Sequence, residues 1–202
     1  MDHFEKIAAH LADDDLDALL LTGEANRYYA SGFHSAGTDG VALVTRQGNY
    51  YFTDARYTEA AGRQIRNATL GEVGHGKGYG TLIQEVIDRE GIRRMGFEDA
   101  YMTVLDHRRY QKALSCELVP ATELLWKLRA VKDPEELEAM TAAQRIAERA
   151  LEDILNDIRP GITEKELAAR LLNGAQLDPE GFADVCRTLA GDRAEEVMDW
   201  LL

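Results

Sequence analysis

Residues able to do chemistry gather after a predicted strand, in the segment YFTDARY at positions 51–57. Asp54 would stand at the end of that strand, where its carboxylate can cap a following helix. Arg56 can pair with an acid or point into a cleft. We favour a capped helix with a solvated Arg56 over contact with a substrate. Phe33 and His34 lie in another loop, and a lone His beside an aromatic residue is more often packed or exposed than a ligand.

Three further patterns suggest ligand sites and are weaker. Residues 74–80 (GHGKGYG) are rich in glycine but have neither the GxxxxGK[ST] spacing nor a GxGxxG frame between a strand and a helix, so we favour a flexible connection. The adjacent acids at positions 13–15 are typical of a solvated surface. Asp106 and His107 fall on a predicted helix without the second ligand four residues away that a zinc-binding helix uses.

The composition is that of a soluble globular protein, with 202 residues of which 45% are hydrophobic and 29% charged. The net charge of −13 argues against nucleic acid and anionic membranes as partners, because phosphate groups require a basic face. Cys116 and Cys186 are too far apart to indicate a disulfide framework or a zinc knuckle. The start has no secretory signal pattern, and no apolar run approaches the roughly 20 residues that span a bilayer. We therefore expect a cytoplasmic protein that does not bind membranes.

Strands and helices are predicted to alternate in the first part of the chain, which indicates an α/β fold with a mixed or largely parallel sheet. A buried central strand is expected at residues 16–21, and Asn26 and Gly32 predict a chain reversal after it. A hairpin is expected at 41–52. The remaining predicted elements are helices at 2–11, 55–65, 81–90 and 103–114 and strands at 69–73, 94–97 and 117–119.

From residue 121 onward the pattern changes to helices only. A helix is expected at 122–132, and Asp133, Pro134 and Glu136 form a capping box that starts a long helix ending before Pro160. A second box at 163–166 opens a helix through residue 172. The long helix carries one apolar stripe, composed of Leu137, Met140, Ala147, Leu151, Ile154 and Ile158.

Four stretches in order carry a family resemblance: residues 26–33 (NRYYASGF), 51–57 (YFTDARY), 128–136 (LRAVKDPEE) and 159–164 (RPGITE). Together they resemble the creatinase, prolidase and aminopeptidase P superfamily, over residues 2–172. The resemblance implies a creatinase-like N-terminal α/β domain at 1–125, the start of a peptidase domain at 126–172, and a divergent helical tail at 173–202.

The resemblance also implies a function for the parent enzymes. They cleave peptide bonds next to proline with two divalent metals (manganese, cobalt or zinc) held by an Asp, Asp, His, Glu, Glu set in the C-terminal domain. Their N-terminal domain shapes the substrate pocket and helps to form oligomers. By resemblance, the pocket candidates in this chain are Phe33, His34, Asp54, Arg56 and Tyr57.

The last part of the sequence departs from that pattern. No histidine follows His107, so the metal histidine of the family has no candidate in the second region. Two-metal hydrolysis needs several ligands converging on one water. We therefore expect no catalytic residue, no metal ligand and no cofactor in this chain.

Two functions remain open. The first is a non-catalytic oligomerisation or binding module, as a homo-oligomer or with a full-length peptidase subunit. The second is a part of an active Xaa-Pro metallopeptidase that shapes a pocket in trans. An unrelated nucleotide-binding protein would rest on residues 74–80 alone.

Overall fold

The computed structural model describes residues 3–74, 76–155 and 158–167. The chain divides into two compact units, residues 1–131 and 132–202. The first unit contains, in chain order, α1 (His3–His10), η1 (Leu11–Asp14), β1 (Ala18–Leu21), α2 (Glu24–Ser31), β2 (Gly40–Thr45), β3 (Asn49–Asp54), α3 (Thr58–Gln64), β4 (Thr69–Val73), α4 (Tyr79–Glu90), β5 (Arg94–Phe97), α5 (Val104–Ala113), β6 (Glu117–Pro120) and α6 (Thr122–Ala130).

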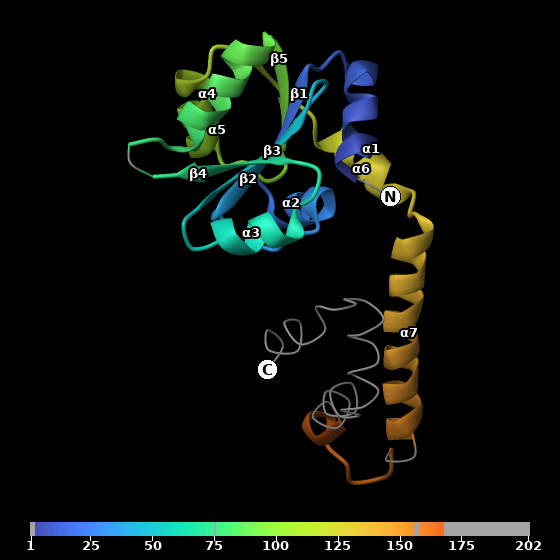
Figure 1. The fold of residues 1–202 in the computed structure, drawn as a ribbon. Coiled ribbons are helices and arrows are strands. Elements are labelled where there is room, and N and C mark those ends of the chain that lie inside the picture. Colours follow the sequence, from blue (N-terminus) through green and yellow to red (C-terminus); the bar gives the residue numbers. More distant parts are fainter. Residues whose placement is uncertain (1–2, 75, 156–157, 168–202) are drawn as a thin grey trace. The chain divides into compact units, whose positions relative to one another are not determined.

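The strands form one six-stranded mixed sheet in the order β4-β3-β2-β1-β5-β6 (Figure 1). Strand β2 is antiparallel to β1 and β3, and the other neighbouring pairs are parallel. The chain therefore fills one side of β1 with β2, β3 and β4 and then crosses to the other side for β5 and β6. As a result, the carboxyl ends of five strands and the amino end of β2 lie at the same edge.

Helices cover both faces of this sheet. Leu19 and Leu21 of β1 pack with apolar residues of α1, α2, α3 and α6, whereas Ala18 and Leu20 pack with residues of α4 and the segments around it. All four residues of β1 are fully buried, as expected for a central strand whose side chains alternate between two covered faces. The predicted α/β class, with a mixed sheet flanked by helices, is confirmed.

Most predicted elements of the first unit are present, and β4 and β5 have the predicted bounds. Helix α3 begins at Thr58, three residues later than expected. The chain reversal expected at Asn26 is wrong, because Asn26 lies within α2. The helix ends at Gly32, whose φ of 66° is the left-handed conformation that glycine accommodates.

The second unit begins with helix α7 (Pro134–Leu155). Its capping box is confirmed: the N–H of Asp133 donates to Glu136 Oε2 and the N–H of Glu136 to Asp133 Oδ1, both at 2.9 Å. The second box is also present, with residues 164–167 helical after Thr163. The rest of that predicted helix, and the tail at 173–202, lie outside the described residues. No helix in the described part of the chain is long and apolar enough to cross a membrane.

Candidate functional site

Ligands of open α/β sheets usually bind outside the carboxyl ends of the strands, where the strand order reverses direction. In this sheet that point lies between β1 and β5. It is occupied by the protein's own Glu98, which follows β5 and is fully buried. The Glu98 carboxylate accepts hydrogen bonds from the N–H groups of Thr22 and Gly23 and from the side chain of Asn26. The Glu98 carboxylate thus occupies the hydrogen-bond donors that could otherwise bind an anionic ligand at this point of the sheet.

Asn26 also connects Glu98 to helix α6, at the end of the first unit. Its Oδ1 accepts a hydrogen bond of 2.6 Å from Arg129 Nη1, near the end of α6. The Arg129 guanidinium also lies 5.7 Å from the centre of the Tyr29 ring. The polar groups of Asn26 are therefore satisfied inside a helix by residues distant in sequence, which is why its preference for turns misled the sequence prediction.

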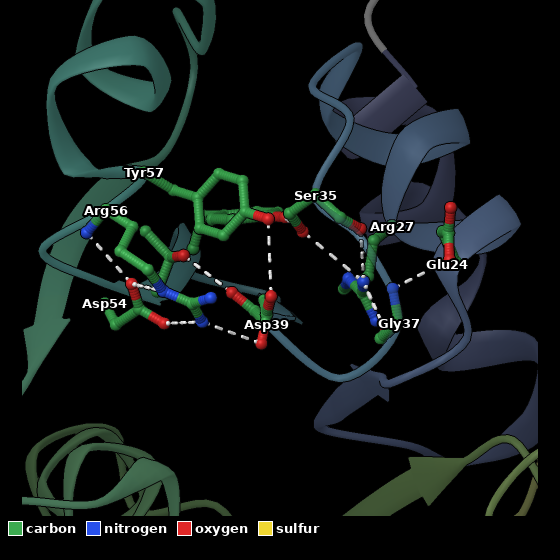
Figure 2. A network of polar contacts seen from close by, with 10 residues as sticks. Glu24, Arg27, Ser35, Gly37, Asp39, Asp54, Arg56 and Tyr57 are labelled. Atoms are coloured by element: carbon green, nitrogen blue, oxygen red, sulfur yellow. Dashed lines mark hydrogen bonds and ion pairs between the residues drawn. The ribbon is translucent and has the colours of Figure 1, made fainter.

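A second polar group lies further along the same edge and consists of Asp39, Asp54, Arg56 and Tyr57, here called the Arg56 cluster (Figure 2). Arg56 Nη2 is 2.7 Å from Asp54 Oδ2 and 3.0 Å from Asp39 Oδ1. The Tyr57 hydroxyl donates to Asp39 Oδ2 at 3.3 Å. Asp39 comes just before β2 and Asp54 ends β3, so the antiparallel pairing of these strands brings the two acids together.

The guanidinium of Arg56 acts electrostatically on the acid at the end of β3. Hydrogen bonds from this guanidinium and from the backbone N–H of Arg56 lower the pKa of Asp54. Hydrogen bonds to Asp54 and Asp39 raise the pKa of Arg56 in turn. Burial, followed by the charges of Asp54 and Asp39, raises the pKa of Tyr79 to about 12. Arg56 and Asp54 thus stabilise each other's charged forms, an arrangement suited to binding a polar group rather than to transferring a proton.

The expected capping role of Asp54 is not observed. Helix α3 has Tyr57 at its N-cap position and no side-chain cap, while the Asp54 carboxylate binds Arg56 instead. Arg56 therefore takes the other role considered for it, pairing with acids, although its side chain is still 66% exposed. The second acid, Asp39, carries no sequence signal, because only the strand register places it beside Arg56.

Phe33 and His34 are neighbours with opposite surroundings. Phe33 is buried and packs edge-on against the rings of Tyr51 and Tyr57, with centroids 5.7 and 6.3 Å away. His34 is exposed, and its Nε2 lies 2.8 Å from Glu24 Oε1. Of the five pocket candidates, Asp54, Arg56 and Tyr57 thus meet in one cluster, Phe33 is part of the core beneath it, and His34 is at the surface with Glu24.

The resemblance places the two-metal centre of the parent enzymes in their C-terminal domain rather than in the sheet unit. Within residues 3–131, position 75 excepted, no three His, Cys, Asp or Glu side chains bring ligand atoms close enough together to share an ion. Asp39 and Asp54, the two carboxylates of the Arg56 cluster, both pair with one guanidinium, which competes with a cation for their oxygens.

Residues 4–131 match the family described as "Creatinase/Prolidase N-terminal domain". The chain belongs to this family. The resemblance seen in the four sequence stretches is thereby confirmed, and the matched segment corresponds to the sheet unit that carries Glu98 and the Arg56 cluster.

Named relatives of the creatinase/prolidase N-terminal domain extend the similarity beyond residue 131. The "Uncharacterized peptidase YqhT" of Bacillus subtilis is 35% identical over 171 residues, which are 83% of this chain and 46% of that protein. The "Xaa-Pro dipeptidase from Bacillus anthracis" has a TM-score of 0.78 at 30% identity and is matched over 87% of this chain and 48% of that one. The chain thus spans about half the length of the curated relatives it matches.

A solved structure of a separate domain matches a smaller part. The "N-terminal domain of cytoplasmic peptidase PepQ from Mycobacterium tuberculosis H37Rv" has a TM-score of 0.54 at 26% identity. It covers 62% of this chain and 97% of that chain. This agrees with a family domain that ends near the boundary between the two units, at residues 131 and 132.

Proposed function

We propose that this chain is the N-terminal part of an Xaa-Pro peptidase-like protein and acts as a non-catalytic binding and oligomerisation module. The observation that carries the proposal is the family match over residues 4–131, which spans nearly the whole first unit. The sheet edge of that unit supports a binding role, since the partly exposed guanidinium of Arg56 is held there by Asp39 and Asp54. The binding surface would be loop 33–39 together with the Arg56 cluster.

The alternative is that the chain forms part of an active Xaa-Pro metallopeptidase and shapes a pocket in trans. The observation favouring it is that loop 33–39 contains both the exposed His34 and Asp39, which binds Arg56. An exposed loop tied to a charged cluster can contribute polar groups to a pocket completed by another chain or domain. The names of the relatives, among them an Xaa-Pro dipeptidase and a putative Xaa-Pro aminopeptidase, suggest proline-containing peptides as the substrates.

The activity and the metal content of the purified chain separate these functions. We expect no hydrolysis of Gly-Pro or of an Xaa-Pro-Xaa tripeptide above a metal-free control after addition of Mn²⁺ or Co²⁺. We also expect no stoichiometric divalent ion by elemental analysis. Hydrolysis with a bound ion would overturn the non-catalytic role. Hydrolysis by a mixture with a full-length Xaa-Pro peptidase that exceeds the rate of that peptidase alone would support the alternative in trans.

The proposal includes a location and a partner. We place the protein in the cytoplasm, in line with the printed name of the similar PepQ domain. We further propose that the chain associates with a second copy of itself or with a full-length peptidase subunit. The apolar stripe of α7 is the surface considered for this, because Leu137, Met140 and Leu151 are each about half exposed.

A further inference from the structure

We propose that Glu24 and Arg27, on one face of α2, are positioning residues that hold loop 33–39 so that it presents His34. This inference rests on the proposed binding role of the loop. Neither residue was a candidate in the sequence, because Asn26 and Gly32 predicted a chain reversal and no helix was expected in this segment. Once it is a helix, residues three apart lie on the same face, and here that face meets the loop (Figure 2).

Glu24 holds the loop at two points with its two carboxylate oxygens. Oε1 lies 2.8 Å from His34 Nε2, and Oε2 accepts a hydrogen bond of 2.9 Å from the backbone N–H of Gly37. The side chains of Glu24 and His34 are each 43% exposed, so their contact adds little to overall stability. Its effect is geometric, because one carboxylate fixes both the imidazole and the backbone three residues later.

Arg27 holds the same loop from the inside. Its side chain is 1% exposed, and Nη2 donates to the carbonyl oxygens of Ser35 and Gly37, both at 2.8 Å. Nη1 donates to the carbonyl oxygen of Thr22, which directly follows β1. A guanidinium has only donors, and a buried charge must be hydrogen-bonded, so the loop backbone has to keep its carbonyl groups turned toward Arg27.

The loop residues on either side of His34 are also fixed. Phe33 and Ser35 are buried, while His34 and Ala36 are exposed. The Ser35 hydroxyl lies 2.7 Å from the Tyr51 hydroxyl on β3. Since both neighbours of His34 point inward and are held there, the imidazole projects outward from a backbone with little freedom. The loop is therefore preorganised, and Glu24 determines where the imidazole points.

Amide exchange measured by NMR on the whole chain tests the positioning directly. In Glu24→Ala the Gly37 amide loses its acceptor, and we expect its exchange to accelerate about tenfold. Glu24→Gln keeps an acceptor oxygen and should leave Gly37 protected. Glu59→Ala is the matched control, because Glu59 forms an exposed ion pair with Arg63 on α3. Unchanged exchange at Gly37 in Glu24→Ala would overturn the inference.

A binding measurement tests the link to function. Gly-Pro and an Xaa-Pro-Xaa tripeptide are titrated into the labelled chain, and we expect resonances of loop 33–39 to shift. Glu24→Ala should weaken this binding about tenfold, with Glu59→Ala unchanged. If the wild-type chain shows no shift, the proposed binding role fails, while the Gly37 exchange still decides the positioning. If Glu24→Ala loosens the loop but binds the peptides as tightly as the wild-type chain, the proposal that Glu24 positions His34 for binding is overturned.

Arg27 provides an independent variant. Arg27→Lys keeps the charge but loses the planar set of donors that serves three carbonyl groups. We expect faster exchange at the loop amides, with the amides of β1 still protected. If the loop amides exchange at the wild-type rate in a folded Arg27→Lys variant, Arg27 does not position the loop.

Discussion

The first unit and helix α7 achieve their order in different ways. In the first unit a central strand is buried on both faces, and polar groups far apart in sequence satisfy one another, as Glu98 and Asn26 do. In α7 the visible signals are local: a capping box at Asp133 and an ion pair between Arg145 and Glu148, three residues apart. Local signals start a helix, but Leu137, Met140 and Leu151 of its apolar stripe remain about half exposed. The comparison teaches that the fold of the first unit depends on contacts between residues distant in sequence, whereas the start of α7 depends on neighbours in the chain.

The largest expected difference between the two regions is in the cost of removing a leucine. Leu20 of β1 is fully buried, and Leu20→Ala should lower the free energy of unfolding by about 3–5 kcal/mol, since it loses apolar contacts and leaves a cavity. Leu137 of α7 is 52% exposed, and Leu137→Ala should change the free energy of unfolding by less than about 0.5 kcal/mol. Urea unfolding followed by circular dichroism measures both. Equal losses would show that the α7 stripe is covered.

Carboxylates provide the next comparison. Glu98→Ala leaves the N–H groups of Thr22 and Gly23 and the Asn26 amide without their acceptor, and should cost about 2–3 kcal/mol. Glu148→Ala on α7 removes only exposed contacts with Arg145 and Gln144 and should leave the unfolding midpoint unchanged. The same urea experiment applies. A neutral Glu98→Ala variant would mean that the reversal point of the sheet is not held by this carboxylate.

Self-association tests the proposed use of the α7 stripe. We expect sedimentation velocity at micromolar concentrations to show a concentration-dependent larger species. Leu137→Glu and Leu151→Glu should each weaken it about tenfold, because a charge would be buried in the contact. Leu105→Glu, at a similarly exposed position on α5 of the first unit, is the control. A single monomeric species at all concentrations would contradict the proposed oligomer.

The smallest expected effect is in the pKa values of two carboxyl groups beside arginines. Hydrogen bonds from Arg56 lower the pKa of Asp54, and a hydrogen bond from Arg145 lowers that of Glu148. Arg56→Ala and Arg145→Ala should raise these pKa values, and NMR titration of the carboxyl carbons measures them. Asp54 should keep part of its shift, because the backbone N–H of residue 56 remains as a donor.

The sign of the pH dependence follows from these lowered pKa values. A carboxyl group whose pKa is lower in the folded chain stabilises the fold above its unfolded pKa, and this contribution is lost as the pH falls through the folded pKa. Acid should therefore weaken the Asp54 contact, and Arg56→Ala should reduce that dependence. An unchanged acid dependence in Arg56→Ala would show that Asp54 does not respond to Arg56.

The sequence was sufficient where the signal is local. The bounds of β4 and β5 and both capping boxes were predicted correctly, because strand periodicity and a four-residue box depend on neighbours in the chain. The family was likewise visible in four short stretches. Gly96 shows what such predictions miss. The strand that contains it was predicted, but the sequence did not show that a Cβ at this position would lie 2.8 Å from Leu19 and from the Cβ of Ala121.

By itself, the sequence determined the α/β class, the order of the main elements, the start of α7 and three members of the Arg56 cluster. Tertiary structure alone decided the rest of the site. Asn26 became helical because Glu98, 72 residues later, satisfies its amide. Asp39 joined Arg56 because of the antiparallel register of β2 and β3. Buried polar groups take whichever conformation supplies their hydrogen bonds, and the partners that supply them are chosen by the fold rather than by neighbours in the chain.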